Sequence, residues 1–287
     1  MLDNIGIALH AATDVGKVRE KNEDSIVSYC HPSQNFAYLA IADGMGGYLG
    51  GAMASQIAVT EIEKHFHLFT SYEFFTIPSE QQEEKICATV QKALLTANQK
   101  IIDAKIEHPE CFNMGTTAVV VVILNKYLVV AHVGDSRAYL WTQESNIQLT
   151  KDHSVVQEMI EAGVLSEDEA KVSPVRNHIT RALGVNEQIE IEMEAYVLNS
   201  PALIMLCSDG VTEYLSNTRI EQFLAANSDI AQTCSEIINH ANLSGGKDNI
   251  SVGLIQFNPS NTIPNAQKDP LWGKVSKSNE DATIRRW

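Results

Sequence analysis

Acidic side chains stand at the ends or starts of several apolar, strand-like segments of this chain. A carboxylate in such a place is partly removed from water, which costs free energy unless a cation or a hydrogen-bond donor compensates its charge. The residues are Glu23 and Asp24 before a short apolar run, Asp43 after residues 36–42, Asp135 between two β-rich segments, Asp209 after residues 202–207, and Asp248 before residues 250–257.

Glycine follows two of these acids directly, in Asp43-Gly44 and in Asp209-Gly210. Glycine lets the backbone turn sharply and leaves a carbonyl oxygen free to coordinate a cation. If the acids converge, they form an all-oxygen site, which suits Mg²⁺ or Mn²⁺ better than Zn²⁺. Two such ions can lower the pKa of a bridging water and orient it for attack on phosphorus. Because Asp-Gly is also a common turn, spacing alone predicts an oxygen-liganded metal site and no more.

The elements that must position these acids form groups along the chain. Apolar and β-branched composition predicts strands at residues 7–13, 36–42, 118–124, 128–133, 137–141, 189–197, 202–207 and 250–257. Helices are expected from Gly51 onward and over residues 80–105, 153–171, 217–225 and 230–242, with Asn217 as an N-cap. Clustered strands and paired helices favour an α+β fold over a doubly wound parallel sheet.

No linker divides the chain before about residue 258, so residues 1–257 are predicted to form one domain. Residues 258–287 lose periodicity and gather three prolines and a glycine, which predicts a flexible C-terminal tail.

Composition excludes several classes of partner. The formal net charge of -15 repels nucleic acid and anionic membranes, so neither is expected as a partner. No apolar run approaches the roughly 20 residues that cross a bilayer. Five scattered cysteines without C-x-x-C spacing argue against a disulfide framework or a zinc knot. The N-terminus has no basic residue before its apolar stretch, unlike a secretory signal. The expected location is therefore the cytoplasm, with export to a host cell left open.

Taken in chain order, the motifs resemble those of the metal-dependent protein phosphatases, the type 2C serine/threonine phosphatases, and most closely the compact bacterial members. The resemblance covers about residues 8–257, and the order and spacing of seven motifs make it specific. They are Thr13-Asp14-Val15-Gly16 through Arg19-x-x-Asn22-Glu23-Asp24, Ala42-Asp43-Gly44-Met45-Gly46-Gly47, Met114-Gly115-Thr116-Thr117, His132-Val133-Gly134-Asp135-Ser136-Arg137, Leu149-Thr150-Lys151-Asp152-His153-Ser154, Ser208-Asp209-Gly210 and Gly245-Gly246-Lys247-Asp248-Asn249.

The resemblance implies a central antiparallel β-sandwich flanked by pairs of helices, in α-β-β-α layers, with the metal site at one end. It also implies two core Mn²⁺ or Mg²⁺ ions and a third, looser ion. By position, Asp43, Asp209 and Asp248 would be direct ligands together with the Gly44 carbonyl; Glu23 and Asp24 would act directly or through water, and Asp135 would help to hold the third ion.

Arg19 matches the arginine that binds phosphate in this family, and with Asp43 and Asp209 it is expected to carry catalysis. A guanidinium fork can take two phosphate oxygens at once. The alternative role is a surface salt bridge with Glu20 or Glu23.

One position departs from the pattern. Many eukaryotic members carry a histidine where this chain has Met45, and a thioether cannot protonate a leaving alkoxide. Water at the metal site or another histidine would have to do so; His153 and His178 lie in suggestive stretches, although a lone histidine is more often structural. Residues 155–183 match the bacterial flap beside the catalytic cleft, a mobile cover that would help to choose substrates.

The resemblance therefore implies a phosphoric monoester hydrolase that removes phosphate from phosphoserine and phosphothreonine by direct attack of water. Its expected partners are phosphorylated proteins, substrates of a Ser/Thr kinase that could include the kinase itself, and the chain is expected to be a monomer. Two alternatives remain: a non-catalytic regulator that binds phosphoproteins, which predicts lost ligands, and a metal-dependent hydrolase of a small phosphorylated metabolite, which predicts a deep closed pocket.

Overall fold

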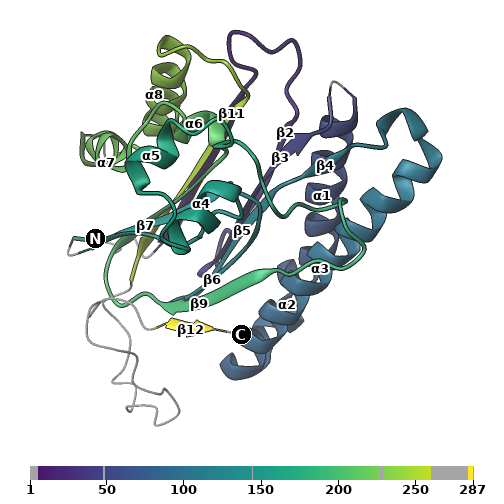
Figure 1. Ribbon diagram of the computed structural model, residues 1–287. Helices are drawn as coiled ribbons and strands as arrows, with labels where there is room; N and C mark the ends of the chain where they lie inside the picture. Colours follow the sequence, from purple (N-terminus) through teal and green to yellow (C-terminus); the bar gives the residue numbers. More distant parts are fainter. Residues whose placement is uncertain (1–5, 48, 144, 227–228, 260–283, 287) are drawn as a thin grey trace.

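The structure, a computed structural model, describes residues 6–47, 49–143, 145–226, 229–259 and 284–286. Two antiparallel β-sheets pack face to face, and helices cover the outer face of each (Figure 1). This arrangement confirms the predicted α+β class and its α-β-β-α layers.

The strands fall into two sheets. In sheet order, the five-stranded sheet contains β1 (Gly6–Asp14), β11 (Ile250–Asn258), β10 (Ala202–Cys207), β7 (Arg137–Trp141) and β8 (Asn146–Gln148). The seven-stranded sheet contains β12 (Ile284–Arg286), β9 (Glu192–Val197), β6 (Tyr127–Val133), β5 (Ala118–Leu124), β3 (Phe36–Met45) and β2 (Asp24–Cys30), with β4 (Gly115–Thr116) paired to the end of β3.

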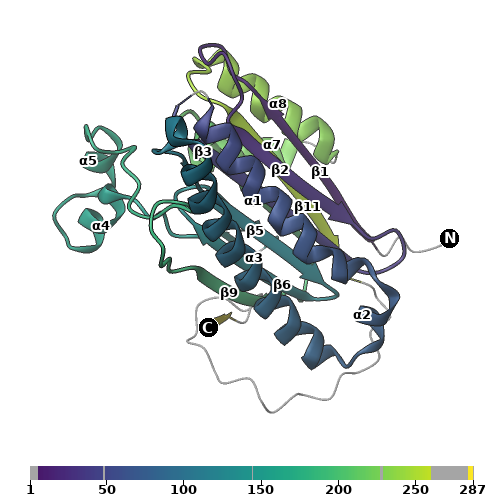
Figure 2. The ribbon, with the colours of Figure 1, turned by 90° about the vertical axis from the view of Figure 1, so that its right-hand side faces the viewer.

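The helices divide between the two faces. Figure 2 shows α1 (Gly50–Phe66) and α3 (Ser79–Glu107) side by side across the seven-stranded sheet, with the short α2 (Tyr72–Thr76) beyond them. The five-stranded sheet is covered by α6 (Asp209–Thr212), α7 (Asn217–Ala226) and α8 (Ile230–Leu243). The helices α4 (Val155–Glu161) and α5 (Glu167–Lys171) stand out from the body (Figure 2). Single 3₁₀ turns occupy His67–Thr70 and Pro109–Cys111.

Alternation along β3 explains why its sequence is apolar throughout. Leu39 and Ile41 face the other sheet, whereas Tyr38 and Ala40 face the helices. Successive side chains of a strand point to opposite faces, so a strand buried on both faces needs apolar residues at every position. The apolar run therefore places β3 at the centre of the molecule, and its end carries Asp43 into the site.

Four local predictions were wrong. The strand predicted at residues 189–197 begins only at Glu192. Residues 153–171 form two short helices, because the chain turns at Gly163 (φ 69°) and Ser166 starts the second helix with a capping box.

The strand that begins at Phe36 continues past Asp43 to Met45, because β4 pairs with its end. Asn217 is the first residue of α7 rather than its N-cap, and Ser216 accepts the hydrogen bond from the Arg219 N–H.

The predicted tail, residues 258–287, lies for the most part outside the described residues. Asn258 ends β11, and Ile284–Arg286 pair with β9 as an antiparallel edge strand. The domain boundary near residue 257 stays a prediction. Among the described residues, no helix combines the length and the apolar character that a membrane crossing requires.

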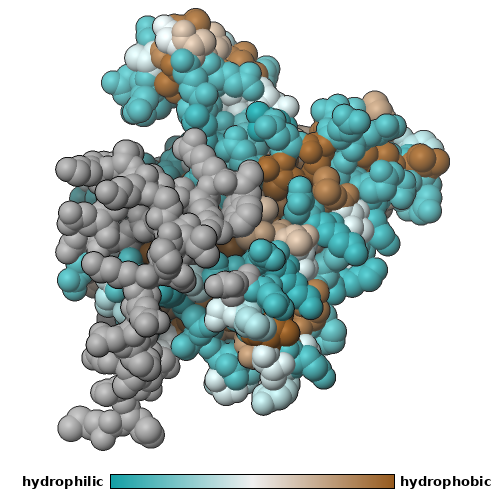
Figure 3. Space-filling view, turned by 90° about the horizontal axis from the view of Figure 1, so that it is seen from below, coloured by the Kyte–Doolittle hydropathy of each residue, from teal (hydrophilic) through white to brown (hydrophobic). Residues whose placement is uncertain are grey.

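The coloured surface seen from below the view of Figure 1 is mostly hydrophilic, and its apolar residues gather only in small groups (Figure 3). Isolated apolar side chains are a normal feature of a surface in contact with water.

Candidate metal centre

The predicted acids come from both sheets and meet at one end of the sandwich. Asp24 begins β2 and Asp43 lies near the end of β3, where the two are direct partners in the ladder. Asp209 opens α6 after β10, and Asp248 precedes β11, the neighbour of β10. Asp135 lies in the turn between β6 and β7. Residues far apart in the sequence thus converge because they stand at the same end of neighbouring strands.

The acids lie close enough to repel one another. The pKa of Asp43 is raised well above its usual value, first by burial and then by the charges of Asp24, Asp209, Asp135 and Asp248. The pKa of Asp209 rises to about 8, again first by burial and then by three of the same charges. Carboxyl groups this close can all be ionised only if a cation offsets their repulsion.

Asp24 is held by hydroxyl groups on one side only. Ser251 Oγ and Ser208 Oγ donate to Asp24 Oδ2 at 2.6 and 2.9 Å. The other oxygen, Oδ1, is buried and has no hydrogen-bond partner. Burial raises the pKa of Asp24 to about 6, and the two hydroxyl groups oppose that rise. One oxygen of this carboxylate is therefore fixed and the other still needs a positive partner.

Glu23, directly before β2, shows the same pattern, and its carboxylate lies beside Gly51 at the start of α1. Its Oε1 is buried without a hydrogen-bond partner, and burial is the largest cause of its raised pKa. A Cβ on Gly51 would lie 2.7 Å from Glu23 Oε1, so the glycine leaves room for the carboxylate. The Gly44 N–H donates to the Glu23 carbonyl at 3.2 Å, which ties the end of β3 to this loop.

These donors fit a hard cation. Two buried carboxylate oxygens lack partners, and the remaining acids, Asp43, Asp135, Asp209 and Asp248, are half-buried, so one side of the site stays open to water. Oxygen atoms are the preferred ligands of Mg²⁺ and Mn²⁺, and such ions usually retain water ligands. The chemistry of the donor set therefore suits the predicted ions.

The turn that carries Asp135 depends on Gly134. This glycine has φ 107°, and a Cβ there would lie 2.6 Å from the Thr117 methyl group, so a larger residue would displace the turn. Burial is the largest cause of the rise in the pKa of Asp135 to about 6, followed by the charge of Asp152. Asp152 itself accepts two hydrogen bonds, of 2.8 and 2.7 Å, from the Arg137 guanidinium.

Arg19 lies beside the acids with its side chain 47% exposed. Its Nη2 donates to Asp248 Oδ2 at 2.8 Å. The sequence analysis gave a salt bridge with Glu20 or Glu23 as the alternative role of Arg19. That partner is wrong, because Arg19 pairs with Asp248, directly before β11. The remaining guanidinium N–H groups can face a phosphate group in solution.

Asn249 is a site residue for which the sequence analysis predicted no role. Its Oδ1 accepts the Glu23 N–H at 2.8 Å, and its Nδ2 donates to the carbonyls of Val15 and Lys21 at 2.9 and 3.0 Å. One side chain thus holds both ends of the loop that carries Arg19. Its sequence signal was its place in the motif Gly245-Gly246-Lys247-Asp248-Asn249.

Met45 and the two histidines considered as proton donors have different environments. Met45 is half-buried and pairs with Gly115 in β4. His153 is buried, with 4% of its surface exposed, and its Nδ1 accepts the Gly134 N–H at 3.1 Å. His178 is exposed, and its carbonyl accepts the Val155 N–H.

Comparison with known proteins identifies the family of this chain. The family model described as protein phosphatase 2C matches residues 9–250. The chain is 32% identical over 244 residues to the serine/threonine phosphatase stp of Listeria monocytogenes, covering 85% of this chain and 93% of that protein. It is 32% identical over 247 residues to the protein phosphatase PhpP of Streptococcus pneumoniae, covering 86% and 96%.

Solved structures show the same fold. The serine/threonine phosphatase of S. agalactiae superposes with a TM-score of 0.77 at 31% identity, covering 88% of this chain and all of that one (100%). The catalytic domain of the phosphatase PstP, solved in complex with two manganese ions, superposes with a TM-score of 0.75 at 27% identity, covering 88% and 98%. The chain therefore belongs to the protein phosphatase 2C family.

Proposed function

We propose that this chain is a Mn²⁺- or Mg²⁺-dependent protein serine/threonine phosphatase that hydrolyses phosphoserine and phosphothreonine. The observation that carries the proposal is the convergence of six acids at one end of the sandwich, two of them with buried oxygens that have no partner. Membership of the protein phosphatase 2C family and the manganese complex of PstP support the same cofactors.

In this proposal Asp43, Asp209 and Asp248 hold two core ions together with the Gly44 carbonyl. Glu23 and Asp24 contribute directly or through water, and Asp135 helps to hold a third ion. When bound, the ions supply the Lewis acidity that activates water for direct attack on phosphorus.

Arg19 binds the phosphate. Its 2.8 Å contact with Asp248 keeps the guanidinium next to the proposed ligands, and its exposure lets it meet a phosphate that arrives from solvent. Orientation of the phosphate relative to the attacking water is the expected contribution of this residue.

We infer that water protonates the leaving alkoxide. Met45 has no proton to give. His153 is buried, and its Nδ1 is occupied by the Gly134 N–H. A solvent-exposed site supplies water without a dedicated acid, so the departure at Met45 is compatible with turnover.

The substrates follow from the openness of the site. The half-buried acids open to solvent, which favours a phosphorylated side chain on a protein surface over a small metabolite in a closed pocket. The regulator alternative predicts lost ligands, whereas acids occupy every expected acidic position. A Ser/Thr kinase partner, a monomeric state and a cytoplasmic location stay predictions.

The test is phosphate release from a phosphothreonine peptide with Mn²⁺, with chelator, and with the variant Asp209→Asn. Asp103→Asn serves as the matched control, because that side chain is exposed on α3, outside residues 155–183. We expect turnover that requires Mn²⁺, disappears in Asp209→Asn and persists in Asp103→Asn. A folded, Mn²⁺-bound protein without turnover on the peptide would contradict the proposal.

A further inference from the structure

The strand β9 lies at an edge of the seven-stranded sheet, and among the described residues β12 alone covers its outer side (Figure 1). The register is antiparallel, with Arg285 opposite Ala195 and Arg286 opposite Glu194. The edge of a strand is a row of N–H and C=O groups that can pair with any extended segment. The other chemistry of the edge must therefore decide which segment covers it.

The backbone groups of β9 alternate between its two neighbours. Leu198, directly after β9, donates its N–H to the carbonyl of Lys126 on the β6 side. In an antiparallel ladder, consecutive residues direct their N–H groups to opposite sides. The N–H groups of Tyr196 and Glu194 therefore also face β6, whereas that of Ala195 faces β12. The exchange rate of the Ala195 N–H thus reports whether β12 is paired.

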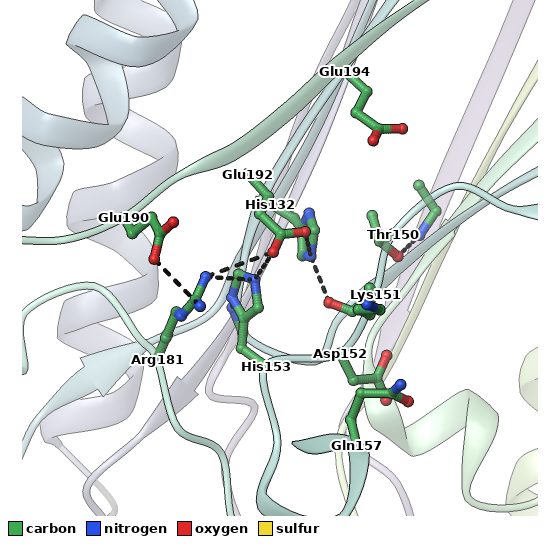
Figure 4. Close-up of polar contacts among 12 residues, drawn as sticks. His132, Thr150, Lys151, Asp152, His153, Gln157, Arg181, Glu190, Glu192 and Glu194 are labelled. Carbon is green, nitrogen blue, oxygen red and sulfur yellow. Dashed lines mark hydrogen bonds and ion pairs between the residues drawn. The ribbon is translucent and has the colours of Figure 1, made fainter. Parts of the chain in front are cut away.

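Glutamates stand at alternate positions along this edge. Glu190 and Glu192 lie 3.3 and 3.6 Å from the Arg181 guanidinium, whereas Glu194 stands apart from that group (Figure 4). Glu194 accepts the hydroxyl of Tyr196 at 2.5 Å. The outer strands β1, β2 and β8 of the described sheets carry no such series of acids. The edge of β9 is therefore suited to a segment with basic residues.

The charges of the chain are divided in a complementary way. Residues 258–287 contain five bases and three acids, a formal charge of +2, which leaves -17 on residues 1–257. A second copy would bring another acidic β9 against this one, and like charges at opposed positions destabilise a ladder. In the observed register a basic residue, Arg286, stands opposite Glu194. Charge thus favours the C-terminal segment over a second copy of the chain.

We propose that the edge of β9 is a docking site for a basic, extended segment and that its occupant is residues 284–286 of the same chain. Main-chain pairing adds the segment to the sheet as a further strand, and Glu194 selects the basic residue opposite it. The docked segment also covers an edge that could otherwise pair with other chains. The proposal rests on the fold and does not depend on the proposed function.

Substitutions in the full chain separate main-chain pairing from charge. Arg285→Pro removes the N–H opposite Ala195 and so breaks the ladder. Arg286→Glu places a like charge opposite Glu194, and Arg285→Glu makes the same change of charge one position away as the matched control. Glu194→Lys changes the acid itself, and combining it with Arg286→Glu restores opposite charges.

The measurement is residue-specific amide hydrogen exchange by NMR. The Ala195 N–H should be protected in the wild type and should exchange roughly tenfold faster or more in Arg285→Pro, Arg286→Glu and Glu194→Lys. Arg285→Glu and the doubly substituted chain should resemble the wild type. The N–H groups of residues 194 and 196, which face β6, should stay protected in every variant and so show that the sheet is intact.

A peptide with the sequence of residues 281–287 tests the docking site directly. It is added to the Arg285→Pro chain at roughly millimolar concentration, the effective concentration of a tethered segment. The peptide should restore protection of the Ala195 N–H, whereas the same peptide carrying Arg286→Glu should not. Failure of the unchanged peptide to restore protection would count against a docking site.

Equal exchange of the Ala195 N–H in the wild type and in Arg285→Pro would overturn the proposal. Equal effects of Arg285→Glu and Arg286→Glu would overturn the selection of a basic residue by Glu194. Protection that increases with protein concentration would assign the edge to a second copy and would overturn the proposed occupant.

Discussion

At the scale of single residues, the acids of the proposed metal centre are poorly suited to the metal-free protein. Asp209 has a pKa of about 8 because burial and three neighbouring carboxylates disfavour its charge. Buried oxygens of Glu23 and Asp24 lack partners. Such conflicts between a residue and its surroundings concentrate at functional sites, where a ligand resolves them.

The first prediction concerns the pH dependence of the metal-free protein. The pKa of Asp209 is about 8 in the folded chain, against an ordinary value of 3.8, so the folded state binds the proton more tightly than the unfolded state does. The contribution of this residue to the free energy of unfolding is therefore present below pH 4 and is lost as pH rises to about 8. Urea unfolding with chelator at pH 5 and pH 8 measures it.

Asp209→Asn is the reference for that experiment, because it removes the titrating group and keeps the shape. The loss of stability between pH 5 and pH 8 should be smaller in Asp209→Asn than in the wild type. Equal losses in the two proteins would contradict the assignment of a raised pKa to Asp209.

The second prediction concerns Arg19. Arg19→Lys keeps the charge but loses the planar fork that can take two phosphate oxygens. If one charge-assisted hydrogen bond is lost, kcat/KM on the phosphothreonine peptide should fall roughly tenfold or more. Mn²⁺ affinity measured by calorimetry should change little. Arg219→Lys, on α7, is the control and should retain full activity; unchanged kcat/KM in Arg19→Lys would count against phosphate binding by Arg19.

At the scale of elements, close backbone approaches decide where the acids point. Gly210 lies at the start of α6, shortly after β10. A Cβ at this position would lie 2.0 Å from the Asn249 carbonyl oxygen. The two loops that carry Asp209 and Asp248 can lie this close only because residue 210 has no side chain. The glycine after Asp209 is thus needed for packing as well as for the turn.

The third prediction follows from this contact. Gly210→Ala should lower the free energy of unfolding by about 1–3 kcal/mol, the usual cost of overpacking. It should also weaken Mn²⁺ binding, because the loops of Asp209 and Asp248 must separate. Gly6→Ala is the matched control, since a Cβ at Gly6 meets nothing within 4 Å. Urea unfolding and Mn²⁺ calorimetry of both variants give the comparison, and equal stability of the two would refute the packing argument.

At the scale of the whole molecule, the site joins the two sheets. Asp43 comes from the seven-stranded sheet and Asp209 and Asp248 from the ends of strands in the five-stranded sheet. Ser251 in β11 and Ser208 directly after β10 both donate to Asp24 on the opposite sheet. Ions bound between these acids would therefore connect the two sheets, and binding would stabilise the entire fold.

The fourth prediction is a change of sign in the effect of Asp43→Asn. In chelator, the variant should be more stable than the wild type above neutral pH, because it removes one of the charges that repel the others. With Mn²⁺ at 100 times its Kd, the wild type should gain about 2.7 kcal/mol of unfolding free energy per site and the variant much less. Thermal unfolding with and without Mn²⁺ measures both effects, and an Asp43→Asn variant that is less stable in chelator would contradict the argument.

Much of the fold could be predicted from local pattern. The strands 118–124, 137–141 and 202–207 have the predicted limits, because a strand with both faces covered is a continuous apolar run with polar ends. The proposed ligands were found for a related reason: an acid at the end of such a run is conspicuous. Helix 153–171 was wrong in extent, because an exposed segment with few apolar residues carries a weak periodic signal.

What the sequence by itself determined is the set of acids, the class of ion that they suit and the α+β order of elements. The tertiary structure alone decided which groups surround each acid. Arg19 pairs with Asp248, 229 residues away, and Ser251 holds Asp24 across 227 residues. His153 accepts the Gly134 N–H beside Asp135 and lies near Glu192, two contacts that spacing in the sequence does not predict. Periodicity reports the few neighbours within an element, whereas these contacts arise only when strands from two sheets end at the same place.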